Sequence, residues 1–523
     1  MRECGTVRSP RLKKPNAVHR KHGQPTLFLL WPKHTVLLDM SFLSLWCCAL
    51  IVVATCCLGT CFAAKPVGAS DVGNLGSFDG NNTLVVGWVD GPNGRGSLDI
   101  IWSCLVTIFL CSWYSLCMNA SALDDSAFDQ YRDKMAMTLL SFLGPEFILL
   151  IAMGQYSSAQ CSVKQFHASG HQKWTLRHAF YADMGGFNLK CPDFAPFPIT
   201  AKQLHYLIEH GYVEYPALTE KEVADKNKIN GIARLATLGQ AGWFAVNSLA
   251  RLIQRIGITH GELTTLGFIF CTMATAYFWR KKPADVECPI IIKSETPIAE
   301  ILVRAGDIAR VPFHKTPLDF ISPNAWSWSR LWALWRKFLD ILGLDYLWFR
   351  PLGNPPIKKI PDDECPEVPR GLCNIFGVLS IIYCGIFLAG WNLHFPTETE
   401  RALWRIASVV QILTVFITSI VDALIRDVPY LREKFAGGKP PQSPDLETPP
   451  LEKQSYRERF RTLAAEHNPD LRINLRLAIP VTLCAAIYSF CRAYILIEDC
   501  ISFRSEPPGI FKTVEWTDFL PHL

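Results

Sequence analysis

The sequence predicts an all-α fold, a polytopic bundle of transmembrane helices with an interfacial amphipathic helix and extramembrane loops. Three observations predict it. The 523 residues are 49% hydrophobic, and the mean hydropathy of +0.15 is too apolar for an ordinary soluble enzyme. Apolar stretches as long as a bilayer-spanning helix, roughly 20 residues, recur along the chain. A tryptophan-rich amphipathic segment lies between two groups of these stretches.

Six stretches are long and apolar enough to cross a bilayer as helices, because hydrocarbon gives the backbone no water to bind. They comprise residues 98–117, 135–155, 263–279, 375–391, 403–425 and 477–497. A seventh stretch, residues 235–253, is interrupted by Gln240, Asn247 and Arg251. Each polar side chain at mid-membrane costs a few kcal/mol unless it finds a partner. This stretch therefore either spans the bilayer or lies re-entrant against its neighbours.

The N-terminal 64 residues combine a basic segment with an apolar run at residues 41–63. The run ends in small residues, a pattern typical of a signal sequence with a cleavage site. Because the basic segment is unusually long and Met40 directly precedes the run, we expect Met40 to be the true start. An uncleaved signal anchor is the alternative. Both interpretations place residues 65–96 outside, where Asn81 lies in a glycosylation sequon.

The charged loops constrain the topology. The positive-inside rule places residues 280–282 and the basic stretch 426–461 in the cytoplasm. This orientation requires six spans after the signal, with residues 235–253 not crossing. Asn119 lies in a second sequon, and its glycosylation would favour the other topology, in which the loop after the first span is outside. We expect the six-span arrangement.

Two segments outside the spans have a distinctive composition. Residues 326–348 place Trp, Leu and Phe on one helical face and charged residues on the other. This pattern is typical of a helix in the headgroup plane, since Trp prefers the interface and basic residues meet anionic lipid. The alternative is a helix packed on the protein's own surface. Residues 436–453 predict a disordered linker, because they bury too little apolar surface to offset chain entropy.

The spans and the polar segments between them divide the chain into consecutive regions. These are a basic N-terminus with a signal sequence or anchor (1–64), an exterior segment (65–96), two transmembrane helices (97–156), a polar extramembrane region (157–234), a marginal and a full transmembrane helix (235–280), an extramembrane region with the Trp-rich helix (281–370), two transmembrane helices (371–426), a disordered basic loop (427–474), a last transmembrane helix (475–498) and a C-terminal tail (499–523). The lipid bilayer, reached through the secretory pathway, is the partner that this organisation implies.

Composition argues against several other classes. The formal net charge is only +5, and no long basic run lies outside the N-terminus, so we expect no nucleic-acid partner. Nineteen cysteines cannot all pair within one chain, and most lie in apolar stretches, where cysteine is usually a small hydrophobe. Without a C-x-x-C pair, zinc ribbons and redox dithiols are poorly supported. No phosphate-binding loop, dinucleotide fingerprint, nucleophile elbow or kinase motif occurs, and we expect no cofactor.

One pair of residues has the spacing of a catalytic motif. His178 and Asp183 form H-x4-D, which glycerolipid acyltransferases use to deprotonate an acceptor hydroxyl. The glycine-rich and arginine motifs of that family are absent, so a structural histidine is the favoured interpretation. The same region contains thiol and imidazole groups that suit zinc, namely Cys161, His167, His171, His178 and Cys191. Their spacing matches no standard zinc site, and we expect no metal there.

Ionisable residues at membrane depth are the more informative candidates, because a charge in lipid is costly unless it faces a partner or a cavity. Glu146 follows Pro145 in the apolar stretch LLSFLGPEFILL. Asp422 lies late in its predicted span, and Arg492 lies near the end of the last one. A pairing of Glu146 with Arg251 or Arg492 predicts either a static structural lock or a relay for protons or substrate. We treat Glu146, Arg251, Asp422 and Arg492 as a possible intramembrane site.

The chain also resembles a large group of uncharacterised fungal multi-pass membrane proteins. The resemblance covers most of residues 87–523 and is carried by segments in a fixed order, namely GPNGRGSLDIIWSCLVTIFLCSW, LGPEFILLIAMGQY, WTLRHAFYADMGGF, ADKNKINGIARLATLGQAGWFAVNSLARLIQ, GWNLHFPTETERALWRIAS and FRSEPPGIFKTVEWTDFLPHL. It implies a membrane location and a helical architecture. The group has no established activity, so no catalytic residue can be carried over. Cys117 stands where the resemblance leads us to expect a histidine.

Three functional hypotheses follow from these features. Glu146 beside a helix-breaking proline, together with the polar stretch 235–253, favours a transporter or channel-like protein. The Trp-rich segment and the linker favour a non-catalytic membrane scaffold. A membrane-bound lipid-modifying enzyme that uses His178 is the third hypothesis.

Overall fold

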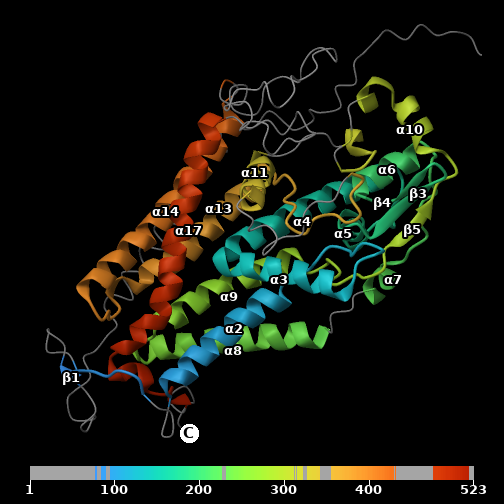
Figure 1. The fold of residues 1–523 in the computed structure, drawn as a ribbon. Helices are drawn as coiled ribbons and strands as arrows, with labels where there is room; N and C mark the ends of the chain where they lie inside the picture. The colour runs from blue at the N-terminus through green and yellow to red at the C-terminus, as the bar shows by residue number, and fades with distance from the viewer. Residues whose placement is uncertain are drawn as a thin grey trace, which may run out of the picture. The chain divides into compact units, whose positions relative to one another are not determined.

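The computed structural model describes residues 77–78, 84–89, 95–226, 231–310, 313, 315–321, 327–341, 355–428, 430 and 475–516, most of which are helical. The predicted signal sequence, Asn81 and the predicted linker lie outside these residues. The helices are α2 (Ser97–Tyr114), α3 (Ala127–Leu143), α4 (Pro145–Ala168), α5 (Leu176–Asp183), α6 (Ala201–Glu209), α7 (Glu220–Asp225), α8 (Gly231–Ile253), α9 (His260–Phe278), α10 (Ile298–Ala305), α11 (Ser327–Ile341), α13 (Arg370–Ala389), α14 (Glu398–Asp427) and α17 (Leu475–Ile501). Figure 1 shows their arrangement.

Four helices within the described residues are long and apolar enough to cross a membrane. These candidate spans are Ser97–Tyr114, Arg370–Asn392, Glu398–Arg426 and Leu475–Arg504. They correspond to the stretches that the sequence predicts at residues 98–117, 375–391, 403–425 and 477–497. Hydropathy locates them because an apolar run of this length is a local property of the sequence.

The predicted span at residues 135–155 is not one continuous helix, because the chain breaks in its middle. Helix α3 ends where the Gly144 amide donates to the Leu140 carbonyl at 2.9 Å, and α4 starts at Pro145. Proline suits the first position of a helix, since the amide hydrogen it lacks would have no intrahelical partner there. The two helices are bent by 116° at this break. Together they form either one broken span or a re-entrant loop.

Helix α9 packs against α2, α4, α8, α13 and α17. The sequence predicts a span at residues 263–279, and α9 covers it, but α9 falls outside the four candidate spans. Most of its side chains are buried within the protein, including Thr264, Thr265 and Thr275. Helix α8, which contains the marginal stretch 235–253, also falls outside them. The structure therefore confirms both helices and uses α9 as a central packing element.

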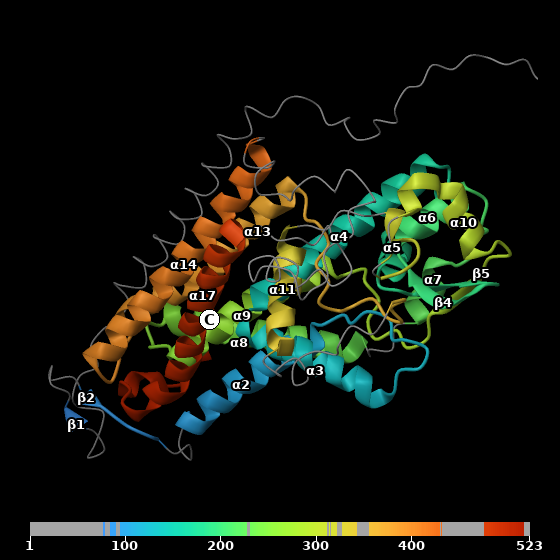
Figure 2. The same cartoon turned by 45° about the horizontal axis from the view of Figure 1, so that its top comes forward.

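Helices α13, α14 and α17 lie side by side in both views (Figures 1 and 2). The Trp404 indole of α14 donates to the Phe387 carbonyl of α13 at 3.1 Å, and the Ser408 hydroxyl donates to the same oxygen at 3.4 Å. Trp404 and Phe387 are both fully buried. These contacts fix the register of α14 along α13. Pro480 lies inside α17, near its start.

The all-α prediction misses a small sheet. Strands β3 (Phe187–Cys191), β4 (Phe194–Ile199) and β5 (Ile290–Lys293) pair in the order β4-β3-β5, antiparallel on one side of β3 and parallel on the other. Phe187 aligns with Ile199 and with Ile290. Helices α5, α6, α7 and α10 gather around the sheet (Figure 1). The two-residue strands β1 (Ser77–Phe78) and β2 (Leu84–Val85) form a separate pair.

Helix α11 supports the alternative interpretation of the Trp-rich segment, a helix packed on the protein itself. Its Leu331 and Leu334 side chains are buried against Ala478 of α17. The Trp335 indole donates to the Thr482 hydroxyl at 3.0 Å, and the Trp332 indole donates to Asp363 at 2.7 Å. These side chains face protein partners, so the apolar face of α11 contributes to the core.

Candidate functional site

Arg492 on α17 is the most unusual charged residue of the helical bundle. Its side chain is fully buried, and none of its three guanidinium nitrogens has a hydrogen-bond partner. The guanidinium carbon lies over three aromatic rings, 4.8 Å from the ring centroid of Phe387, 5.2 Å from that of Phe268 and 5.5 Å from that of Tyr383. Cation–π contacts offset part of the cost of burying the charge. They leave all five N–H donors free to bind an acceptor.

Glu146 occupies the first turn of α4, beside the helix break. Its Oε1 accepts a hydrogen bond from the Tyr488 hydroxyl at 2.7 Å, whereas its buried Oε2 has no partner. Tyr488 and Arg492 lie four residues apart on α17, a spacing that places them on one helix face. Glu146 and Arg492 therefore belong to one cluster, as the sequence suggests, although they form no ion pair within 4 Å. The start of α4 also favours a negative charge through the helix dipole.

More buried polar groups without partners lie on the neighbouring helices. On α13 these are the hydroxyl groups of Ser380 and Tyr383, one helical turn apart. On α14 the Gln411 amide has no partner at either its oxygen or its nitrogen. Gln411 follows Ser408, which contacts α13, by about one turn. Unpaired buried polar groups each cost about 1–3 kcal/mol, and such groups deserve a functional explanation.

Arg251, another predicted member of the site, has a structural role elsewhere. Its guanidinium donates to the carbonyl oxygens of Gly257, Ile510 and Lys512 at 2.8, 2.6 and 2.7 Å. It thereby joins the end of α8 to the C-terminal segment. The predicted pairing with Glu146 does not form; the nearest carboxylate is Glu262, 3.9 Å from Nε.

Asp422, the fourth predicted member, also lies apart from Glu146 and Arg492. It forms an ion pair of 2.8 Å with Arg426, one turn along α14. Arg426 in turn donates to the Val368 carbonyl at 2.9 Å. The structure thus brings together Glu146 and Arg492 of the four predicted residues, and it adds Tyr488 and Tyr383. Nothing in the sequence marked these two tyrosines, which lie in apolar stretches, as members of the cluster.

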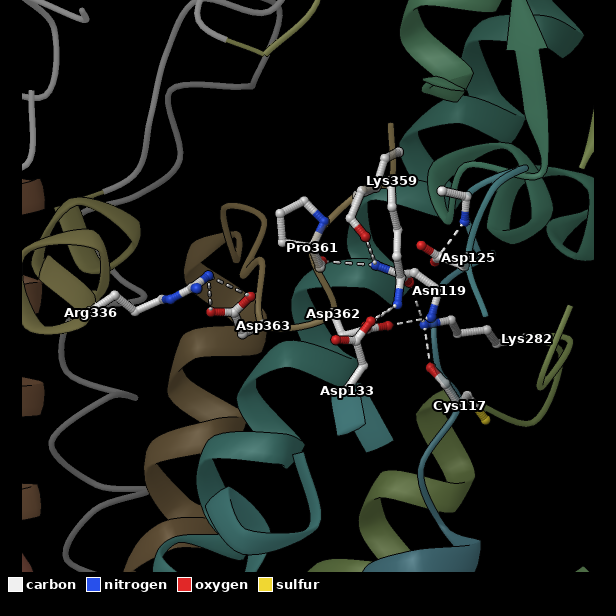
Figure 3. A network of polar contacts seen from close by, with 12 residues as sticks. Cys117, Asn119, Asp125, Asp133, Lys282, Arg336, Lys359, Pro361, Asp362 and Asp363 are labelled. Carbon is white, nitrogen blue, oxygen red and sulfur yellow. Dashed lines mark hydrogen bonds and ion pairs between the residues drawn. The ribbon is translucent and has the colours of Figure 1, made fainter. Parts of the chain in front are cut away.

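A second polar network surrounds Lys282, just after α9 (Figure 3). The buried ammonium donates to the Cys117 carbonyl at 2.7 Å, to Asn119 Oδ1 at 3.0 Å and to Gln155 Oε1 at 2.9 Å. Three donors thus meet three acceptors, none of them charged. Burial lowers the pKa of Lys282 to about 8. The sequence placed Lys282 among cytoplasmic charges, but the structure makes it the centre of a buried junction.

The network continues through Lys359, on the segment before α13, and the carboxylates that surround it. Lys359 donates to Asp133 at 2.7 Å and to Asp362 at 2.6 Å, and Asp362 also accepts from the Asn119 amide at 2.5 Å. Burial alone would lower the pKa of Lys359, but the two neighbouring carboxylates raise it. Arg336 of α11 pairs with the adjacent Asp363 at 3.2 Å (Figure 3). The network holds α3, α11 and the segment before α13 together.

Asn119 lies inside this network, although the sequence predicts a sequon there. Its side-chain nitrogen donates to the Pro361 carbonyl at 2.9 Å, and the residue is 4% exposed. A glycan on that nitrogen would displace this hydrogen bond and the packing around it. Glycosylation of Asn119 stays a prediction that the packing disfavours.

An acid–base cluster that the sequence analysis missed lies at the start of α9. Glu262 accepts from the Thr259 amide at 2.9 Å and pairs with Arg95. The His260 ring contacts Trp404, and its Nδ1 lies 3.8 Å from Glu506. The T-x-x-E pattern of a capping box could have located this helix start.

The H-x4-D pair does not form a catalytic dyad in the structure. Both ring nitrogens of His178 are engaged, Nδ1 with Thr175 at 2.8 Å and Nε2 with the Leu218 carbonyl at 3.0 Å. Asp183 instead accepts from the Ala201 amide at 3.0 Å, at the start of α6. Burial lowers the pKa of His178 and raises that of Asp183. These contacts hold α5 against its neighbours. They leave His178 no free ring nitrogen to act as a base.

The candidate zinc ligands also have separate contacts or positions in the structure. His167 Nε2 contacts the Trp174 carbonyl at 2.9 Å, and His171 stacks on Tyr215. Cys161 is exposed, whereas Cys191 is buried in β3. Across the part of the chain that the structure describes, no group of three or more His, Cys, Asp or Glu side chains could hold a metal ion.

The fold and the site define a mostly helical protein with candidate membrane-spanning helices and a buried polar cluster between them. The chain belongs to a family of unknown function (DUF8562), whose model matches residues 77–305 and 371–523. This match confirms the prediction of an uncharacterised family. Glu146, Lys282 and Arg492 lie in the matched regions. No curated protein and no solved structure matches the chain.

Proposed function

We propose that this chain is a multi-pass integral membrane protein that moves a small solute across the bilayer. The outer faces of the candidate spans support the membrane location. On α17, Ile479 and Leu483 are each 61% exposed and Phe490 is 78% exposed. They recur at the spacing of one helix face. A contiguous apolar surface of this kind is rare on soluble monomers and suits lipid.

Arg492 is the observation that carries the transport proposal. A guanidinium buried between apolar helices without a single hydrogen bond is costly, and residues kept at such cost usually serve ion or substrate pathways. Its surroundings come from different elements, with Glu146 on α4, Phe268 on α9 and Tyr383 on α13. A site shared by separate helices can change shape when the helices move against one another.

The break between α3 and α4 supports the same proposal. Glu146 lies in the first turn after the 116° bend. In many transporters, substrate and ion sites form where a membrane helix is interrupted, because the exposed helix end binds charge directly. The broken segment thus brings both a helix dipole and a carboxylate to the cluster around Arg492.

The test is solute flux into liposomes that contain the purified full chain. Labelled amino acids, sugars, carboxylates, inorganic anions and cations are offered one class at a time. We expect at least one class to enter faster than into protein-free liposomes, and Arg492→Gln to lose this flux. Asp422→Asn is the matched control, because its ion pair with Arg426 lies outside the cluster. If every class enters at the protein-free rate, the transport proposal is overturned.

A further inference from the structure

We propose that the cluster around Arg492 binds a small monocarboxylate anion and that Glu146 takes up one proton with it, so that the two are transported together without net charge. This inference rests on the proposed transport function. It adds the chemical class of the solute and the coupling ion.

The guanidinium defines the solute. Its planar fork of N–H donors matches the two oxygens of a carboxylate, which can accept two parallel hydrogen bonds. None of its nitrogens has a hydrogen-bond partner, and the guanidinium carbon lies over the rings of Phe268 and Phe387. The Phe268 and Phe387 rings give the organic part of the solute apolar neighbours. The unpartnered hydroxyls of Tyr383, whose ring contacts Arg492, and of Ser380, one turn before it on α13, are further donors.

The charge balance of the site defines the coupling. In the proposed cycle, the solute-free site holds Arg492 as a guanidinium cation and Glu146 as a carboxylate, so that the charges of these two residues cancel. A bound anion would leave a net negative charge in a medium of low dielectric constant, where an uncompensated charge is expensive. Protonation of Glu146 restores neutrality. The Oε2 atom of Glu146 has no hydrogen-bond partner and can receive this proton.

Apart from Arg492, the groups around Glu146 carry no positive charge that could compensate the bound anion. From α17 they are Tyr488 and Arg492, from α9 Cys271, and from α13 Tyr383 and Cys384. Apart from Arg492 these are neutral hydroxyls and thiols. Asp499, a second carboxylate near Arg492, lies about two turns further along α17, and its Oδ1 accepts from the Thr264 hydroxyl at 3.0 Å, whereas Glu146 Oε2 has no partner. Glu146 is therefore the carboxylate on which the proton would reside.

The step balances in atoms and charge. The carboxylate of the solute replaces Glu146 as the counter-ion of Arg492, and a proton from the same side of the membrane binds Glu146 Oε2. No bond other than this O–H bond forms. Release on the other side reverses both events, so each cycle carries one anion and one proton.

The test uses proteoliposomes of the full chain, with lactate as the anionic probe and lactamide as its neutral amide counterpart. With an inside-alkaline pH gradient, we expect lactate uptake at least tenfold faster than into protein-free liposomes under the same gradient, a control that corrects for lactic acid crossing the lipid unaided. A potential of either sign, set with potassium and valinomycin, leaves the rate unchanged. Lactamide enters at the protein-free rate. Uptake of lactate that follows the potential and ignores the pH gradient would overturn the coupling.

Variants separate the two residues. With Glu146→Gln we expect exchange of lactate for lactate to continue and the response to the pH gradient to disappear. Arg492→Gln loses both activities, and Arg492→Lys, which keeps the charge without the planar fork, raises the KM for lactate by at least tenfold. Each variant is first compared with Asp422→Asn for monodispersity in detergent. If a cation or a neutral solute is transported while lactate is not, the carboxylate inference fails and the transport proposal stands.

Discussion

The buried ammonium of Lys282 gives a quantitative prediction about stability. Burial lowers its pKa from 10.5 to about 8 in the folded protein. Between these two values the unfolded chain binds the proton more tightly, so the folded state gains stability as the pH rises. The difference corresponds to about 3 kcal/mol, at roughly 1.4 kcal/mol per pH unit. Lys282→Met removes the titrating group and with it this pH-dependent gain.

The same substitution also removes hydrogen bonds. The Cys117 carbonyl and Asn119 Oδ1 lose the Lys282 donor, whereas Gln155 Oε1 still accepts from the Trp279 indole at 3.0 Å. Two buried acceptors without partners cost about 3 kcal/mol together, at about 1–3 kcal/mol each. At neutral pH this loss is offset by removal of the buried charge, which costs the folded wild type about 3 kcal/mol, so we expect Lys282→Met and the wild type to be about equally stable there.

Unfolding in detergent, followed from pH 7 to pH 10, measures both effects. We expect the two proteins to be about equally stable at pH 7 and the wild type to gain about 2.5 kcal/mol over Lys282→Met by pH 10. The neighbouring Lys281 is exposed, so Lys281→Met should follow the wild-type curve at every pH. Parallel curves for the wild type and Lys282→Met would refute the assignment of a lowered pKa to this buried group.

Three further predictions follow from single contacts. Arg251→Ala leaves three carbonyl oxygens without their donor. We expect the stability to fall by about 3 kcal/mol and residues 508–516 to be cleaved faster by protease. Arg304 is exposed, so Arg304→Ala should change neither. Gly154→Ala would place a Cβ 2.6 Å from the Pro366 carbonyl oxygen. A melting experiment should therefore show a loss of stability of about 2 kcal/mol. Gly239 has open space around it, so Gly239→Ala should show no such loss. Asn119→Gln should leave the mobility shift on endoglycosidase treatment unchanged, because the Asn119 side chain is buried; a lost shift would contradict this packing.

The sequence predicts the apolar helices well because hydropathy and length are local properties. Helices α2, α13, α14 and α17 lie where the sequence places spans. The break before α4 illustrates the limit of this approach. Pro145 was visible in the sequence, but whether a proline kinks one helix or starts a new one depends on the surrounding packing.

The sheet could not be predicted from local patterns. Strand β4 contains Pro196 and Pro198, which usually argue against a strand except at a sheet edge. β4 is indeed at the edge, and β5 joins β3 in parallel from a segment about one hundred residues later in the chain. Such a pairing depends on contacts between distant parts of the sequence.

The candidate site was predicted in part, for a physical reason. An ionisable residue in an apolar stretch stands out, which is why Glu146 and Arg492 were found. The partner of each could not be read from the sequence. Arg251 binds backbone carbonyls, and Tyr488 rather than a cation contacts Glu146. Lys282 was missed because a lysine beside Arg280 and Lys281 has the pattern of an exposed basic loop.

The central claim is that the apolar helices lie in a lipid bilayer, and alkaline carbonate extraction of membranes from cells that express the full chain tests it most directly. We expect the protein to stay in the membrane pellet, as an integral protein does, because the exposed apolar faces of α14 and α17 would otherwise be in water. Quantitative release into the carbonate supernatant as a monodisperse, folded protein would contradict the membrane assignment and the transport function proposed from it.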